Sequence, residues 1–534
     1  MRSWLALPLC ALLPLKAPWF AAGAAVLGLW RLLAERRLYL GWAFAGLALL
    51  GALGQWFSYT GFVPALKPPS YIAPRAPATQ VNPVGPYLYD LLGWNHEDGG
   101  HRGAQPVEEG FWRIPRHNPS SGREFREFLT DRWYPLEPGK TYTQSFYLRH
   151  DGREARLRIT FFTQRGHHPV PTQKELVAPG VWRVWASYTA QEGDRAVRAI
   201  DFFNEGGDYT YLEVGWPQLE EGTTPSPYRM GPTGLKGLEW RLGWWVGAAL
   251  LGFLVLQAGV WLLRVVPPSV VAWGVLLGML AHLGYAGWQW LEAGPGARAA
   301  GLTPQPNFLG HGAVAAAGLV WALGGRRLGG VALAVAAATL WLSGSRTAFW
   351  ALLLLGAAWG WSLGRYRWLA LGAGGLLAGV ALAEPELLGR LAQALTLDSN
   401  AQARLQFWQV AWQAFREHPL GGVGFGHFPL YFDLHPPRGA IEYSPGHAHN
   451  LGLQLLAEGG LLALVALGLW LAGVGWALAR RRAWAALTLL GAVLLLNTTD
   501  FTFFSAWVYY PLLLAVAGAL GPSANSHQAP IKPG

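Results

Sequence analysis

The segment PGHAHNLGLQLLAEGGLLALVALGLW, Pro445 to Trp470, joins a polar pair of histidines to a long apolar stretch. About 20 apolar residues span the hydrocarbon core of a bilayer. Ionisable side chains at such a boundary are costly, and imidazole exchanges protons near neutral pH. The segment therefore predicts a membrane helix with His447 and His449 just before its N-terminus, and it suggests a function for a histidine there.

A second segment, SGSRTAFWALLLL from Ser343 to Leu355, places Arg346 at the N-terminal end of another apolar stretch. A guanidinium is permanently charged, and its planar fork suits phosphate. Ser343 and Ser345 can cap a helix that we expect to begin near Thr347, and the dipole of that helix favours an anion. The alternative is an arginine that extends to lipid headgroups.

The composition is that of a membrane protein. Of 534 residues, 52% are apolar and only 13% are charged, about half the usual charged share. The net charge of +10 comes mostly from short loops between apolar stretches, which indicates membrane orientation rather than nucleic-acid binding. Cys10 is the only cysteine, so the chain forms no internal disulfide. We predict a polytopic α-helical membrane protein.

Hydrophobicity predicts about 12 transmembrane helices. They are expected at 3–15, 18–33, 38–58, 239–263, 269–291, 307–323, 328–343, 347–363, 367–383, 449–478, 483–497 and 506–521. With this count the arginine clusters all fall on one side, which the positive-inside rule makes cytoplasmic. The turn carrying Arg346 and the loop carrying the histidines then share the outer face. A cleaved signal peptide at the N-terminus is the alternative for the first stretch.

Six regions follow from this topology. They are 1–58 and 239–383 (transmembrane helices), 59–238 (an extracytoplasmic domain), 384–448 (an extracytoplasmic loop with a surface helix), 449–521 (C-terminal transmembrane helices) and 522–534 (a cytoplasmic tail).

Residues 59–238 contain short alternating runs separated by Gly, Asn and Asp, which predicts an antiparallel β-sandwich. Leu136 to Arg229 resembles the jelly-roll domains of carbohydrate-binding modules, most specifically in Pro217 to Tyr228. Exposed aromatic residues would stack on sugar rings, and alternation makes some of them core instead. The candidates are Trp182, Trp185 and Tyr188. The fold alone leaves the role of this domain open.

The 384–448 region contains a helical repeat of mostly apolar residues, namely Arg404, Phe407, Trp408, Ala411, Trp412 and Phe415. This spacing predicts an amphipathic helix along the membrane surface. Arg404 falls on the apolar stripe, so we expect it to point inward towards a partner such as a phosphate. The following GGVGFG, Gly421 to Gly426, is either a loose phosphate loop or a tight turn after Pro419.

Three polar residues are expected near the histidines. In GLTPQPNFLGHGAV we expect Asn307 to cap the next helix, and Asn450 should cap the helix after His449. Asp500, in the short loop NTTD, either orients a histidine, pairs with an arginine or is solvated.

His449 is a candidate general base, with a solvated loop histidine as the alternative. The pair His447 and His449 could suggest a metal, but no acidic or cysteine partner has diagnostic spacing, so we predict none.

Together, SGSRTAFW, ARLQFWQVAWQAFREHPLGGVGFGHF and HAHNLGLQLLAEGGLLAL resemble the O-antigen ligase family. That family also contains Wzy-type polymerases and protein O-oligosaccharyltransferases. The resemblance covers about Gly301 to Asp500. It implies a GT-C-like fold in the bacterial cytoplasmic (inner) membrane, an active site on the extracytoplasmic face, and no metal or other cofactor.

By this resemblance, Arg346 and Arg404 match the two diphosphate-binding arginines, and His449 matches the catalytic histidine. His447 has no such place in the pattern and is secondary. Gly460 fits the ligase pattern after the His-Asn pair, but Ala463 stands where ligases typically have Gly, Thr or Tyr.

The implied function is metal-independent, inverting transfer of a glycan from undecaprenyl diphosphate to a glycan, lipid or protein hydroxyl. A lipid-linked glycan transporter is the rival class, because twelve spans also suit transporters. A glycan-sensing protein acting through the β domain is a third possibility.

Overall fold

The computed structural model describes residues 6–34, 38–61, 71–72, 105–107, 109, 111–117, 127–128, 133–228, 238–294, 297–368, 372, 375, 399–435, 437 and 445–521. The chain divides into two compact units. The first comprises Met1–Phe62, Leu238–Phe425 and His447–Gly534, and the second comprises Val63–Gly237 and Gly426–Gly446. Most of the predicted span 367–383 and the whole predicted tail 522–534 lie outside the described residues.

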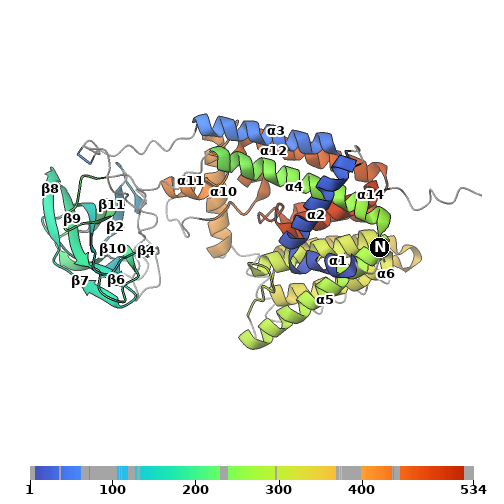
Figure 1. Ribbon diagram of the computed structural model, residues 1–534, viewed down its shortest axis with the longest axis horizontal. Helices are drawn as coiled ribbons and strands as arrows, with labels where there is room; N and C mark the ends of the chain where they lie inside the picture. Colours follow the sequence, from blue (N-terminus) through green and yellow to red (C-terminus); the bar gives the residue numbers. More distant parts are fainter. Residues whose placement is uncertain are drawn as a thin grey trace, which may run out of the picture. The chain divides into compact units, whose positions relative to one another are not determined.

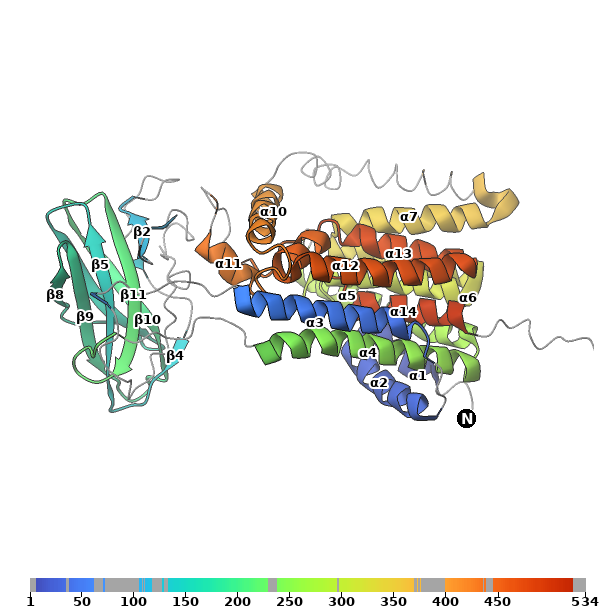
Figure 2. The same ribbon diagram turned by 90° about the horizontal axis from the view of Figure 1, so that it is seen from above.

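The first unit is helical (Figures 1 and 2). Its helices are α1 (Ala6–Leu15), α2 (Ala17–Ala34), α3 (Gly41–Gly61), α4 (Leu238–Val265), α5 (Pro268–Ala293), α6 (Pro306–Ser343), α7 (Arg346–Ser362), the short 3-10 helix η4 (Gly364–Tyr366), α10 (Ser399–Glu417), α12 (Leu451–Arg480), α13 (Trp484–Leu496) and α14 (Ala506–Leu520). Within the described residues, α4, α5, α6 and α12 are long and apolar enough to cross a membrane. Every predicted span except 367–383 coincides with a helix, but the total of twelve stays a prediction.

Helix α6 is a helical hairpin rather than one rod. Gly325 has φ 74° and ψ −169°, a conformation that favours glycine and reverses the chain direction. The two limbs correspond to the predicted spans 307–323 and 328–343. Because the limbs pack against each other, the beginning and the end of α6 lie together: a Cβ added at Gly310 would lie 2.9 Å from Ser343 Oγ.

Helix α12 is also interrupted, at Gly460, which has φ 61° and ψ −161°. Backbone groups released by a break inside a bundle need partners, because burying them unpaired is costly. The segment 419–424 supplies these partners through four backbone hydrogen bonds. They run from Val423 N–H to Ala457 O (2.7 Å), Gly424 N–H to Glu458 O (3.1 Å), Leu461 N–H to Pro419 O (2.8 Å) and Leu462 N–H to Leu420 O (3.3 Å).

This docking explains the glycines of GGVGFG and of α12. A Cβ on Gly460 would lie 2.3 Å from Leu420 O, and one on Gly422 would lie 2.4 Å from Ala457 O. The N–H of Phe425 donates to Gln55 Oε1 of α3 at 2.8 Å. The backbone N–H groups of residues 422–425 are therefore used within the protein. The phosphate-loop interpretation is wrong, and the alternative, a tight turn after Pro419, fits.

Helix α10 packs against α12 and crosses the bundle direction instead of following it (Figures 1 and 2). Its buried face consists of Ala403, Phe407, Val410, Ala411 and Ala414. This face is rotated from the predicted stripe, since Trp412 is 48% exposed. Arg404 is half-buried at the edge of the buried face rather than in its centre.

The second unit contains an antiparallel β-sandwich and helix α11 (Phe428–Leu434). The strands are β1 (Gln105–Pro106), β2 (Phe111–Pro115), β3 (Glu127–Phe128), β4 (Trp133–Pro135), β5 (Thr141–His150), β6 (Ala155–Thr163), β7 (Gly166–Pro169), β8 (Gln173–Ala178), β9 (Val181–Thr189), β10 (Ala196–Gly207) and β11 (Tyr211–Glu221). One sheet has the order β1-β2-β11-β5-β9-β8. The other has β3-β10-β6-β7, with β4 also paired to β10.

The two sheets pack face to face through aromatic residues. Phe146 of β5 stacks on Phe202 of β10 at 5.0 Å between ring centroids, and Phe161 of β6 stacks on Tyr188 of β9 at 5.2 Å. Each pair takes one ring from each sheet. The predicted β-sandwich is thereby confirmed.

The stretch Pro217 to Tyr228, in which the resemblance to jelly-roll domains is most specific, folds back over β11. Glu220 Oε1 accepts hydrogen bonds from Ser226 N–H at 2.8 Å and from Gln218 Nε2 at 2.7 Å. Tyr228 packs edge-on against Trp216 at 5.6 Å. In the described structure, these contacts therefore hold the segment that follows β11 against that strand.

The sugar-stacking candidates on β9 divide by strand alternation. Tyr188 is 7% exposed and donates its hydroxyl to Asp194 Oδ2 at 2.6 Å, so the alternative of a core residue applies to it. Trp182 is half-buried, with Lys174 Nζ 5.2 Å from its ring centroid. Trp185 is also half-buried.

Candidate active site

The site lies in the helical unit, where the loop before α12 meets the loop between α13 and α14. The backbone N–H of Leu451 donates to Asn497 O at 3.0 Å, and Asn450 Nδ2 donates to Thr498 O at 2.9 Å. These bonds hold two segments distant in sequence side by side. They bring His449 Nδ1 to 3.5 Å from Asp500 Oδ1.

The local backbone fixes the position of His449. Asn450 is the N-cap of α12, and its Oδ1 accepts from Leu453 N–H at 2.9 Å, which confirms the predicted cap. His449 itself has φ 50°, an uncommon value for a residue other than glycine. Such conformations occur at functional sites, where the surrounding structure holds them.

Asn497 shapes the loop that carries Asp500. Its side-chain Oδ1 accepts from the N–H groups of both Thr502 and Phe503 at 2.8 Å. Asn497 is 2% exposed, so these bonds are protected from water. Sequence analysis did not single it out, although an Asn at a helix end is a signal for such turns.

Asp500 is a buried carboxylate with partners from separate elements. Its Oδ1 accepts from Phe501 N–H at 2.8 Å, and its Oδ2 accepts from Asn307 Nδ2 of α6 at 3.2 Å. Burial by itself raises the pKa of Asp500. The contacts with His449, His311 and the Phe501 N–H outweigh burial and hold that pKa below its usual range. Asp500 is therefore ionised at neutral pH and faces His449.

His447 completes the cluster. Its ring centroid is 4.1 Å from that of His449, and its Nδ1 accepts from His449 N–H at 3.3 Å. Burial first, and then the charges of His449 and Arg404, lower the pKa of His447 to about 4, with Asp500 acting in the opposite direction. His447 is thus neutral at pH 7.

One donor atom from each of His447, His449 and Asp500 lies within 4.8 Å of the others. Two imidazoles and a carboxylate form a donor set that zinc accepts. The predicted absence of a metal rested on the spacing of acids in the sequence, and that argument missed Asp500 because it comes from a distant loop. The absence of a metal stays a prediction.

Arg346 is the first residue of α7, with Ser345 at the N-cap position. Ser345 thus occupies the predicted cap position but makes no side-chain cap hydrogen bond, and α7 begins one residue before Thr347. Thr347 Oγ1 lies 2.7 Å from Thr499 Oγ1, the neighbour of Asp500. The arginine-bearing helix end is thus anchored to the loop that carries Asp500.

Helix α10 borders the cluster on another side. Phe407 stacks on His449, with ring centroids 5.9 Å apart and an angle of 23° between the planes. Arg404 is one turn earlier on α10, and its charge acts on His447. Helix α10 therefore places Phe407 against His449, and Arg404 is on the same helix.

Asn307 does not cap α6, because Gln305 is the N-cap and Pro306 the first helical residue. Its side chain instead bridges Asp500 and Arg298. Arg298 Nη2 donates to Asn307 Oδ1 at 2.7 Å, and Arg298 Nε donates to Ser343 O at 2.8 Å. Sequence analysis missed Arg298, which no recognisable motif marks.

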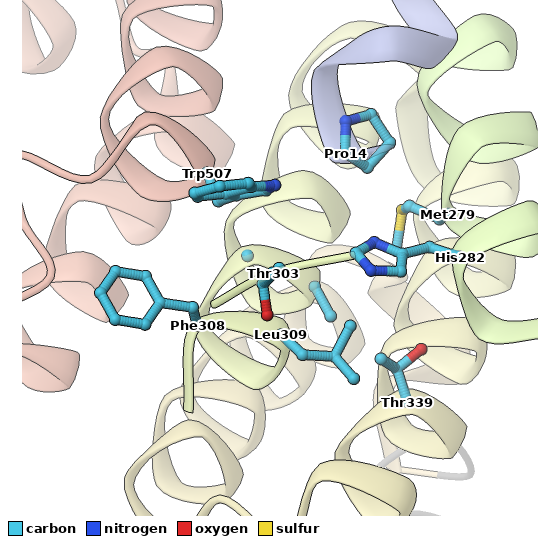
Figure 3. Close-up of a pocket in the computed structure, with 10 residues that line it drawn as sticks. Pro14, Met279, His282, Thr303, Phe308, Leu309, Thr339 and Trp507 are labelled. Carbon is cyan, nitrogen blue, oxygen red and sulfur yellow. The ribbon is translucent and has the colours of Figure 1, made fainter. Parts of the chain in front are cut away.

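A small cavity lies on the other side of the beginning of α6 (Figure 3). The His282 ring and the Trp507 indole face each other across it, below Pro14 of α1. The cavity has a volume of about 10 Å³, roughly what one water molecule requires. A sugar does not fit there, and we place the candidate site at the loop cluster.

The apolar helices and the charged cluster at their ends define a multi-pass membrane protein. Residues 331–468 match the family model described as O-Antigen ligase, so this part of the chain is similar to the O-antigen ligase/Wzy family. No curated protein matches the chain significantly. The matched region includes Arg346, Arg404 and His449, whereas Asn307 and Asp500 lie outside it. This family supports a glycan-handling function of the ligase or polymerase kind.

Proposed function

We propose that the protein transfers a glycan from undecaprenyl diphosphate to an acceptor hydroxyl at the outer face of the bacterial cytoplasmic membrane. The observation that carries this proposal is the contact of 3.5 Å between His449 Nδ1 and Asp500 Oδ1. The charge of Arg404 acts on the adjacent His447. His449 and Arg404 both belong to the segment that matches the family model. A base, an orienting acid and cations are the groups that such a transfer needs.

His449 is the proposed general base. Its Nδ1 is buried and faces Asp500, which favours the tautomer with a proton on Nδ1. Its side chain is 28% exposed, so Nε2 is the nitrogen left to take a proton from outside. As Nε2 accepts the hydroxyl proton, the acceptor oxygen attacks the anomeric carbon. The bond from that carbon to the diphosphate oxygen breaks, and the configuration is inverted.

Arg346 and Arg404 are the proposed diphosphate-binding residues. The diphosphate leaves with the bonding electrons, so negative charge grows on its bridging oxygen. Positioned cations stabilise this charge most when they are fixed before the reaction. Arg346 stands at the N-terminus of α7, where the helix dipole adds to its charge. Arg404 approaches from α10.

The proposed reaction uses no metal. The donor already contains an activated bond, and the two arginines supply positive charge. The charge of Arg404 close to His447 also disfavours a divalent cation between the histidines. Metal dependence of the reaction would contradict this part of the proposal.

The break in α12 bears on the transporter alternative, because broken helices are typical of transporter substrate sites. In those sites the freed backbone groups coordinate the cargo. Here the groups around Gly460 are bonded to segment 419–424. The break therefore supports a rigid scaffold better than a cargo site.

The acceptor divides the family members: a lipid A core for a ligase, a growing glycan for a Wzy-type polymerase, and a Ser or Thr hydroxyl for a protein O-oligosaccharyltransferase. Ala463 departs from the ligase pattern, and it is 0% exposed in α12. The proposal therefore includes all three acceptor classes, with the ligase-like reaction as the primary form.

The test is reconstitution. Purified full-length protein is incubated with undecaprenyl-diphosphate glycan and each acceptor class, with and without a chelator, and products are identified by mass spectrometry. We expect one acceptor to gain the glycan with inverted linkage, unaffected by the chelator. Movement of the lipid-linked glycan across vesicle membranes without any transfer product would establish the transporter class instead.

A further inference from the structure

We infer that Arg298 is a positioning residue of the transfer site: through Asn307 it fixes the hydrogen bond to Asp500 and thereby the orientation of His449. This inference rests on the proposed function. It concerns a residue outside the family-matched segment, 331–468.

The contacts form one continuous chain. Arg298 Nη2 donates to Asn307 Oδ1 at 2.7 Å, and Asn307 Nδ2 donates to Asp500 Oδ2 at 3.2 Å. The other carboxylate oxygen of Asp500 faces His449 Nδ1 at 3.5 Å. Asn307 contacts Arg298 through its amide oxygen and Asp500 through its amide nitrogen, and Asp500 contacts Asn307 and His449 through different carboxylate oxygens. A change at Arg298 is therefore transmitted to His449.

Donor and acceptor chemistry gives this chain a direction. A guanidinium has only donors, and an ionised carboxylate has only acceptors. Arg298 therefore requires the amide oxygen of Asn307 on its side, which leaves the amide NH₂ for Asp500. Asp500 favours the same orientation, because an amide oxygen against the carboxylate would be repulsive. Arg298 thus reinforces this orientation and fixes the position of the amide from its other end.

Arg298 is itself anchored to a fixed part of the fold. Its Nε donates to the carbonyl of Ser343 at 2.8 Å, and Ser343 is fully buried at the end of α6. Asn307 belongs to the first turn of α6. Arg298 therefore joins the two limbs of the α6 hairpin at Asn307 and at Ser343, three residues before Arg346.

The test is an epistasis experiment on the full-length protein. Variants are R298M, N307A, the double variant and R298K, with R326M as the matched control. Arg326 is exposed at the other end of the hairpin. We expect R298M to lower kcat by up to about 100-fold, the effect of misplacing a catalytic group, with the KM for the donor unchanged. R298K should recover part of the loss, and R326M should resemble the wild type.

Two results discriminate this relay from direct substrate binding. In the N307A background, R298M should cause no further loss, because Arg298 acts through Asn307. N307D keeps an acceptor for Arg298 but cannot donate to an ionised Asp500, so it should be as damaging as N307A. A raised donor KM in R298M together with full additivity in the double variant would overturn the inference and make Arg298 a diphosphate ligand.

A second readout needs no substrate. Diethylpyrocarbonate modifies neutral imidazoles, and peptide mapping reports the rate at His449 alone. We expect R298M and N307A to speed this modification towards the rate of D500N. No change in R298M, or none in D500N, would overturn the relay. Because this readout does not require transfer, it remains informative if reconstitution yields no product and the proposed function fails.

Discussion

The two units each bury an aspartate, and the two aspartates differ in what surrounds them. Asp194 of the β-sandwich accepts hydrogen bonds from Thr163 Oγ1 at 2.7 Å, Tyr188 OH at 2.6 Å and Gln191 N–H at 2.8 Å. Asp500 of the helical unit accepts from Asn307 and Phe501 N–H, and its third neighbour is the half-buried imidazole of His449.

In both aspartates, hydrogen bonds outweigh burial and lower the pKa of the carboxyl. The difference lies in the partners. Those of Asp194 come from one strand of each sheet, β6 and β9, and from one turn, and they close the sandwich. Those of Asp500 come from separate helix ends and include a residue that can exchange a proton. A buried carboxylate therefore indicates function here only through the group that it orients.

The strongest test of the helical site is His449→Ala. We expect transfer to fall by about 10²–10⁴-fold, the usual contribution of a general base, while folding and donor binding persist. Product formation by mass spectrometry and thermal unfolding are measured on the same preparation. His447→Ala is the control and should be much milder. A variant that keeps more than about a tenth of the wild-type activity would refute the role of His449.

The comparison of the aspartates can be tested directly with a matched pair, Asp500→Asn and Asp194→Asn. We expect D500N to lower kcat by about 100-fold with a small change in unfolding temperature, because it disturbs the orientation of the base. D194N should destabilise the sandwich by about 1–3 kcal/mol through lost hydrogen bonds, and spare transfer to a small acceptor.

Activity and thermal unfolding are measured for both variants. If D194N lost activity as D500N does, or if D500N were mainly a folding defect, the distinction between the two aspartates would fail.

Substitution of Arg346 and of Arg404 tests the proposed binding of the leaving diphosphate. Arg346→Lys and Arg404→Lys keep the charge but lose the planar fork. We expect each to reduce kcat/KM by about 10- to 100-fold, the value of one charged hydrogen bond. Arg416→Lys, at the exposed end of α10, is the control and should have no effect. Full activity of both site variants would leave the diphosphate without its proposed ligands.

The smallest effect is expected from the sandwich. Replacing residues 70–232 by a short flexible linker should reduce use of a polymeric substrate by about tenfold, because tethering raises local concentration. A small soluble acceptor should be used as before. Both rates are measured in a variant shown to be folded. Equal loss on both substrates would mean that the domain helps to build the active site, and no loss on either would make it dispensable for transfer.

The sequence by itself determined the features that depend on neighbours along the chain. Apolar runs located the helices, alternation located the strands, and the spacing at Asn450 predicted a cap, since each depends on a few consecutive residues. The same local patterns predicted Asn307 as a cap and left Tyr188 as either a sugar contact or a core residue. The cap was wrong, because Pro306 already begins α6, and only the structure decided that β9 turns Tyr188 inward to Asp194.

Only the tertiary structure decided which distant residues meet. The contact of Asp500 with His449, the bridge through Asn307 to Arg298, and the docking of segment 419–424 on Gly460 join loops from different helices. No local periodicity encodes such contacts, because they depend on how the helices pack and where the hairpin of α6 returns. The sequence thus determined the elements and several of the reactive residues, and the packing of helix ends decided which of them form one site.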